Sequence, residues 1–193
     1  MRFSIFLCVV LIMVGCGHVP VSSLLKLNKV DVLTVDPGDI RVAVSMPDGI
    51  DVRKGGGVLK VGVHESRAGE AKAETFILAK EKSPTGLAGI PGATDIQERI
   101  MIFKISIIDL PRIRVLQNEI AERKARYPDD VQGFLSVDVS ACRLTSELPE
   151  LIPTTTWLKT RNDRPFFLLT KSIDLRDVIK PEELESELGP CLP

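Results

Sequence analysis

The sequence predicts an α+β domain, in which a mainly antiparallel sheet of about seven strands carries one amphipathic helix. The first observation is that short segments with alternating apolar and polar residues recur along residues 39–193, as in strands with one buried face. The second is that only Pro111–Arg126 has an apolar repeat typical of a helix. Four strands, one helix and three strands in this order favour a helix covering one face of a sheet. A β-sandwich with a helical insertion is the alternative.

The turn signal Asp36-Pro37-Gly38-Asp39 places the start of this single domain at residue 39. Four strands are expected before the helix, and Gly55-Gly56-Gly57 is expected to be a flexible hairpin connection. The last of the four is apolar on both faces, which favours a central strand covered on both sides. The expected ranges are Ile40–Met46, Val58–Val63, Thr75–Ala79 and Ile100–Ile108.

The expected helix begins near Asp109 as its cap, with Pro111 in the first turn, where a missing N–H donor costs nothing. Its apolar stripe is predicted to pack on the sheet. The pairs Glu119 with Arg123 and Glu122 with Arg126 have the spacing of i,i+4 ion pairs. The stripe consists of Ile113, Leu116 and Ile120.

Three strands are expected after the helix, at Leu135–Ala141, Thr155–Lys159 and Phe166–Thr170. The C-terminal segments Leu175–Ile179 and Pro181–Leu184 are expected to form short helical turns. The single tryptophan, Trp157, is flanked by threonines on a predicted strand. Its ring either packs in the core or offers a contact surface.

The first residues have the pattern of a secretory signal: Arg2, then the apolar run Phe3–Val14, then Gly15-Cys16. The run is shorter than the roughly 20 residues that a membrane-spanning helix needs. We therefore expect the chain to be exported.

The tetrapeptide Met13-Val14-Gly15-Cys16 resembles the lipobox of bacterial lipoproteins. This resemblance implies that residues 1–15 are a signal peptide and that Cys16 carries a diacylglyceryl group after cleavage. Residues 16–38 would then form a lipidated tether. Gly17 instead of Asp favours the outer membrane, with the domain facing the periplasm. The domain also resembles uncharacterised bacterial lipoproteins, which implies no activity.

Charge and cysteine content limit the function further. Without residues 1–15 the chain has 24 basic and 26 acidic side chains, so no basic excess indicates nucleic-acid binding.

Cys142 and Cys191 both remain after the expected cleavage of the signal peptide. In an oxidising compartment they are expected to form a disulfide, with two free thiols as the alternative.

No motif names a catalytic centre. Two histidines are present, and His64-Glu65-Ser66 is a weak candidate for a hydrolase triad because neighbours on a strand point to different sides. Neither a zinc-site spacing nor a phosphate-binding loop occurs, so no catalytic residue, metal or cofactor besides the lipid on Cys16 is expected.

The sequence therefore favours a non-enzymatic binding or accessory module of the cell envelope, anchored through Cys16, with a ligand or an envelope protein as its partner. Two alternatives stay open. A carrier of a lipid or hydrophobic ligand would need a large apolar cavity between sheet and helix. A hydrolase would need His64 beside a carboxylate, together with an exposed Ser or water site.

Overall fold

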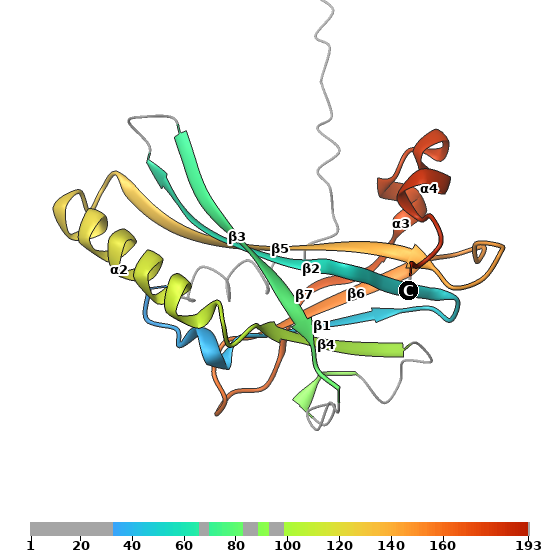
Figure 1. Ribbon diagram of the computed structural model, residues 1–193, viewed down its shortest axis with the longest axis horizontal. Coiled ribbons are helices and arrows are strands. Elements are labelled where there is room, and N and C mark those ends of the chain that lie inside the picture. The colour runs from blue at the N-terminus through green and yellow to red at the C-terminus, as the bar shows by residue number, and fades with distance from the viewer. Residues whose placement is uncertain (1–32, 66–69, 83–88, 93–98, 193) are drawn as a thin grey trace, which may run out of the picture.

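The computed structural model describes residues 33–65, 70–82, 89–92 and 99–192. Seven strands and three α-helices follow one another along these residues (Figure 1). The expected signal peptide, Cys16 and most of the tether lie outside the described residues. The elements are η1 (Pro37–Asp39), β1 (Arg41–Met46), β2 (Ile50–Glu65), β3 (Glu70–Lys80), β4 (Arg99–Ile105), α2 (Leu110–Arg126), β5 (Val131–Arg143), β6 (Pro153–Lys159), β7 (Phe167–Asp174), α3 (Leu175–Val178) and α4 (Pro181–Glu187).

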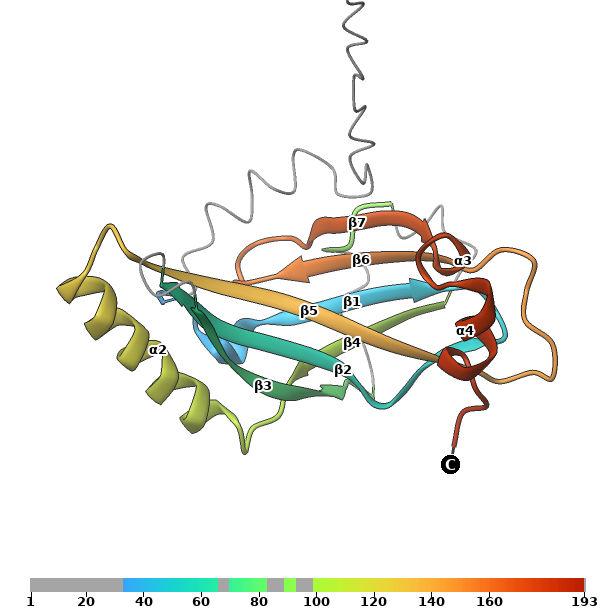
Figure 2. The same ribbon diagram turned by 90° about the horizontal axis from the view of Figure 1, so that it is seen from above.

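The seven strands form one sheet in the order β5-β2-β3-β4-β1-β6-β7, and neighbouring strands are antiparallel. The sheet curls like half of a barrel, with α2 at one end of its long strands and α3 and α4 at the other (Figures 1 and 2). The α+β prediction with a mostly antiparallel sheet is therefore confirmed. A β-sandwich, which needs two packed sheets, is not what the chain forms.

Strand β3 pairs with β2 along its first part and with β4 along its last part. Residues 70–77 pair with β2, whereas Leu78–Lys80 pair with Ile105–Phe103 of β4. Each neighbour therefore covers only part of β3, which crosses between them diagonally (Figure 1). Beyond the end of β3, a gap remains between β2 and β4.

The helix α2 packs near the other end of β3, mainly on β5, β2 and η1. Its Ile113 and Ile120 are buried against the main core, and Leu116 is half-buried there. Arg112 lies over the ring of Phe76, 4.3 Å from its centroid, and donates to the carbonyl of Thr75 over 2.6 Å. A helix side chain thus takes the place of a strand partner for β3.

The core lies on both faces of the sheet. The larger cluster covers one face with side chains from β1 to β6 and from α2 and α4. A smaller cluster on the opposite face consists of Ala43, Ile90, Ile102, Trp157 and Phe166. Central strands β1 and β4 are thus covered on both sides, as the apolar pattern of β4 predicts. No helix in the described part of the chain combines the length and the apolar character needed to cross a bilayer.

Three local predictions are wrong. Gly55-Gly56-Gly57 is no hairpin connection but a bulge within β2, where the register to β5 shifts between Val52 and Gly57. Ile107 and Ile108 lie beyond the end of β4 and are each 81% exposed, because the chain turns there to enter α2. Arg123 pairs with Glu65 of β2 over 2.9 Å rather than along the helix, since the sheet lies within reach of its guanidinium.

Candidate functional site

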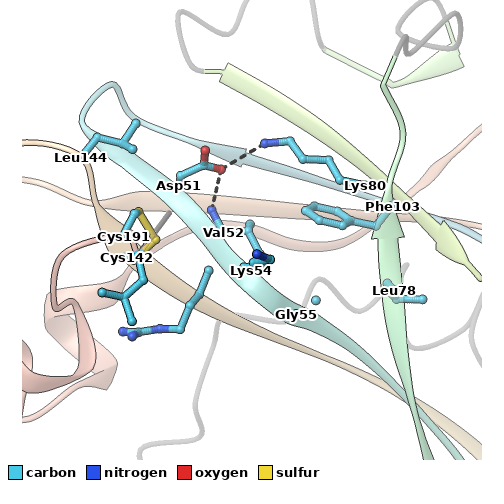
Figure 3. A pocket seen from close by; sticks show the side chains of 13 residues that line it. Asp51, Val52, Lys54, Gly55, Leu78, Lys80, Phe103, Cys142, Leu144 and Cys191 are labelled. Carbon is cyan, nitrogen blue, oxygen red and sulfur yellow. Dashed lines mark hydrogen bonds and ion pairs between the residues drawn. A yellow bond between two sulfur atoms is a disulfide. The ribbon is translucent and has the colours of Figure 1, made fainter.

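The gap between β2 and β4 forms a groove of about 630 Å³ (Figure 3). It exists because β3 pairs with β4 only as far as Lys80 and with β2 only from Val58 onward, which leaves no strand between the two neighbours beyond that point. This volume is typical of small-molecule sites. The groove is lined by Asp51, Val52, Arg53, Lys54, Gly55, Gly57, Leu78, Lys80, Phe103, Cys142, Leu144, Cys191 and Leu192.

Charged side chains form hydrogen bonds with backbone groups of β2 that face the groove and have no strand partner there. The carboxylate of Asp51 accepts a hydrogen bond from the backbone N–H of Val52 over 2.7 Å. It also forms an ion pair with Lys80 Nζ over 3.2 Å (Figure 3). The guanidinium of Arg99 donates to the carbonyl of Ile50 over 2.9 Å and contacts Asp51 at 3.2 Å. Asp51 and Arg99 thus replace the acceptor and the donor that a further strand would supply.

The deep part of the groove is apolar. Val52, Leu78 and Phe103 are core residues that also border the groove. A Cβ atom at Gly57 would lie 3.3 Å from the ring of Phe103, so the glycine leaves room for that ring against β2. Figure 3 shows the ring pointing from β4 across the groove toward β2.

The C-terminal segment closes one end of the groove. Cys142 and Cys191 form a disulfide with their Cα atoms 5.0 Å apart, which confirms the predicted bond. Beside it, Cys191 N–H donates to the carbonyl of Arg143 over 2.9 Å. Arg53 donates to the carbonyl of Glu187 at the end of α4 over 3.0 Å. The end of the chain is therefore fixed to β5 and β2.

The lining of the groove carries a positive excess, because three cations face one carboxylate. Arg53 is held by carbonyl oxygens, and Lys80 is held by Asp51. Lys54 is exposed and forms neither a hydrogen bond nor an ion pair with the described residues. Among the lining cations of the described chain, its ammonium group is therefore the one that can pair with a charged group of a ligand.

A second and smaller pocket, of about 170 Å³, lies between α2 and β3. Charged residues of both elements border it along with four apolar side chains. It does not supply the large apolar cavity that a carrier with its ligand between sheet and helix requires. The lining residues are Val63, Lys72, Ala73, Glu74, Leu116, Glu119, Ile120 and Arg123.

Two other residues that the sequence singled out, Trp157 and His64, are not among the residues that line the groove. Trp157 is only 1% exposed and belongs to the smaller cluster, so its ring packs in the core rather than forming a contact surface. Its Nε1 has no hydrogen-bond acceptor among the described residues. Cys16, the predicted lipidation site, is outside the described residues.

His64 lies exposed near the end of β2, opposite Ala71 of β3 and Gln132 of β5. Its neighbour Glu65 pairs with Arg123 of α2. In the described chain, no group of three or more histidine, cysteine or acidic side chains is arranged to hold a metal ion.

Sequence reasoning missed the groove, although it named Cys142 and Cys191 as a disulfide and Gly55 and Gly57 as part of a turn. The lining residues come from segments that are distant along the chain, and nothing in the sequence shows that they meet. One signal was present: Lys54 and the three glycines that follow interrupt the alternation of β2. That interruption is typical of a bulge as well as of a turn.

No protein-family model matches this chain, and neither the curated proteins nor the solved structures contain a match.

Proposed function

We propose that this protein is a lipid-anchored binding module of the bacterial cell envelope, and that the β2–β4 groove is its binding site. The observation that carries the proposal is the groove itself, which combines apolar side chains with Lys54, a cation that has no partner among the described residues. Sites of this kind bind ligands through apolar contact and use a few charged groups for orientation.

The proposal of an exported, anchored protein rests on the sequence of the first sixteen residues. The disulfide between Cys142 and Cys191 supports it, because such bonds persist in oxidising compartments. The proposed anchor is the diacylglyceryl group on Cys16, with the domain facing the periplasm from the outer membrane. Two or more acyl chains give stable attachment, whereas one chain gives only reversible attachment.

Binding without catalysis is favoured over hydrolysis. The hydrolase hypothesis asks for a carboxylate that orients His64, but the adjacent Glu65 is engaged by Arg123. The strand neighbours of His64 are alanine and glutamine. The groove, in contrast, places its charges around an apolar interior.

The experiment uses a photoactivatable phenylalanine analogue at Leu192, on the rim of the groove, in cells that express the full chain. Illumination should produce an adduct, because Leu192 is 76% exposed beside the site. The same analogue at Lys171, exposed on β7 and outside the groove lining, is the matched control. The adduct should disappear when Lys54→Glu is combined with the analogue at Leu192.

The absence of an adduct at Leu192, or an adduct that Lys54→Glu leaves unchanged, would contradict the proposed binding site. The anchor is tested separately by the intact mass of the protein from envelopes. We expect an acyl mass on Cys16 and its loss in Cys16→Ser.

A further inference from the structure

The groove combines features that select one chemical class of ligand. We propose that it binds a single-chain amphiphile whose headgroup is anionic, with the headgroup at Lys54 and the chain along the apolar interior. This inference rests on the proposed function, because it names the ligand of that same groove.

The apolar side chains of the groove offer a contact surface for a hydrocarbon chain. Val52, Leu78 and Phe103 form its interior, and they come from three different strands. Leu144 and Leu192 extend the apolar surface to the rim, where they are 54% and 76% exposed. A chain seated between interior and rim would remove this exposed apolar area from water, at roughly 25 cal/mol per Å².

The charged side chains of the groove favour a headgroup with a negative charge. Arg53 and Lys80 are used within the protein, by the carbonyl of Glu187 and by the carboxylate of Asp51. Lys54 has no such partner among the described residues and is one of the exposed residues that line the groove (Figure 3). An anion at its ammonium group gains a charge-assisted hydrogen bond, whereas a cationic headgroup would be repelled by the net positive lining.

An extended peptide fits the groove less well than an amphiphile. A peptide added as a strand needs free backbone groups on the sheet edge. At this edge the N–H of Val52 is taken by Asp51 over 2.7 Å, and the carbonyl of Ile50 is taken by Arg99 over 2.9 Å. An amphiphile needs neither group, so it can bind with both interactions in place.

The test is calorimetric titration of the mature domain with dodecanoate below its micelle concentration. We expect saturable binding of dodecanoate. Dodecyltrimethylammonium, which has the same chain and the opposite charge, should not bind, and acetate, which lacks the chain, should not bind either. Saturable binding of dodecyltrimethylammonium with equal affinity would overturn the assignment of the headgroup.

The matched variants are Lys54→Glu and Lys171→Glu, which change charge equally at two exposed lysines. Lys54→Glu should weaken dodecanoate binding by about tenfold or more, the loss expected for one charge-assisted hydrogen bond. Lys171→Glu should bind like the unmodified domain. Thermal melts of both variants separate a loss of binding from a loss of folding.

Failure of this inference and failure of the proposed function give different results. If dodecanoate does not bind, or binds equally well to Lys54→Glu, the amphiphile is the wrong ligand class. The proposed binding site would still stand if the adduct at Leu192 forms and depends on Lys54. A peptide found in that adduct would identify strand addition and overturn the amphiphile.

Discussion

Gly62 lies on β2 where the backbone of β3 leaves no room for a side chain. A Cβ atom at this position would lie 2.2 Å from the carbonyl oxygen of Lys72 and 2.7 Å from the Cα of Ala73. Both atoms belong to the backbone of the paired strand, so neither can rotate away. The close approach is a property of the paired strands, and the sequence of β2 alone does not reveal it.

Gly62→Ala should therefore lower the free energy of unfolding by about 1 to 3 kcal/mol through overpacking. Gly133→Ala, on the neighbouring strand β5, is the control, because its nearest contact would be an ordinary 3.8 Å to Ile120. Denaturant melts of the two variants make the comparison. Equal losses would show that β2 and β3 are not so closely paired.

Asp36 caps the short helix η1 and gives a prediction about pH. The backbone N–H of Gly38 and the guanidinium of Arg114 both hold the pKa of this carboxyl below its ordinary value of 3.8. Since the folded-state pKa is the lower one, the stability that Asp36 contributes is present above about pH 3.8 and is lost as the pH falls through the folded-state value.

An NMR titration should show the carboxyl of Asp36 titrating below 3.8. Arg114→Gln should raise this pKa only part of the way, because the hydrogen bond from Gly38 is the larger cause and remains. Full recovery of the ordinary value in Arg114→Gln would assign the whole shift to the ion pair.

At the scale of elements, α2 contributes to stability through the side of the helix that meets the sheet. Ile113 and Ile120 are 1% exposed, whereas Glu122 is exposed. Ile113→Ala should cost about 2 to 5 kcal/mol, and Glu122→Ala should cost a few tenths at most. Comparable shifts in denaturant melts would mean that α2 does not pack through Ile113.

The bond between Cys142 and Cys191 joins the segment after α4 to β5. The bond closes a loop with a sequence separation of 49, for which the chain-entropy model gives about 4 kcal/mol. Replacing both cysteines by serine should lower the free energy of unfolding by an amount of this order. A melt unchanged by the double replacement would contradict a structural role for the bond, and non-reducing peptide mapping checks that it forms.

Local sequence patterns predicted most elements but not their ends. Alternation identified all seven strands, because each places apolar side chains against the core, although those of β7 are only half-buried. It failed at Gly55-Gly56-Gly57, since a bulge and a turn both use glycine. It failed again at Ile107 and Ile108, where two apolar residues lie in an exposed turn.

At the scale of the whole molecule, the strand order could not be predicted from the sequence. The neighbours β2 and β5 are separated along the chain by β3, β4 and α2, and nothing local in β2 specifies that pairing. The groove depends on this order, since it forms where β3 ends between β2 and β4. The disulfide was predictable because only two cysteines remain after the proposed processing.

The measurement that tests the central claim most directly is an NMR titration of the isotope-labelled mature domain with dodecanoate. We expect shifts of backbone amides around the groove, at Asp51, Lys54, Leu78 and Phe103, with those beside the smaller pocket, such as Val63, unchanged. Shifts confined to α2 and the smaller pocket, or no shifts while the protein remains folded, would contradict the groove as the binding site.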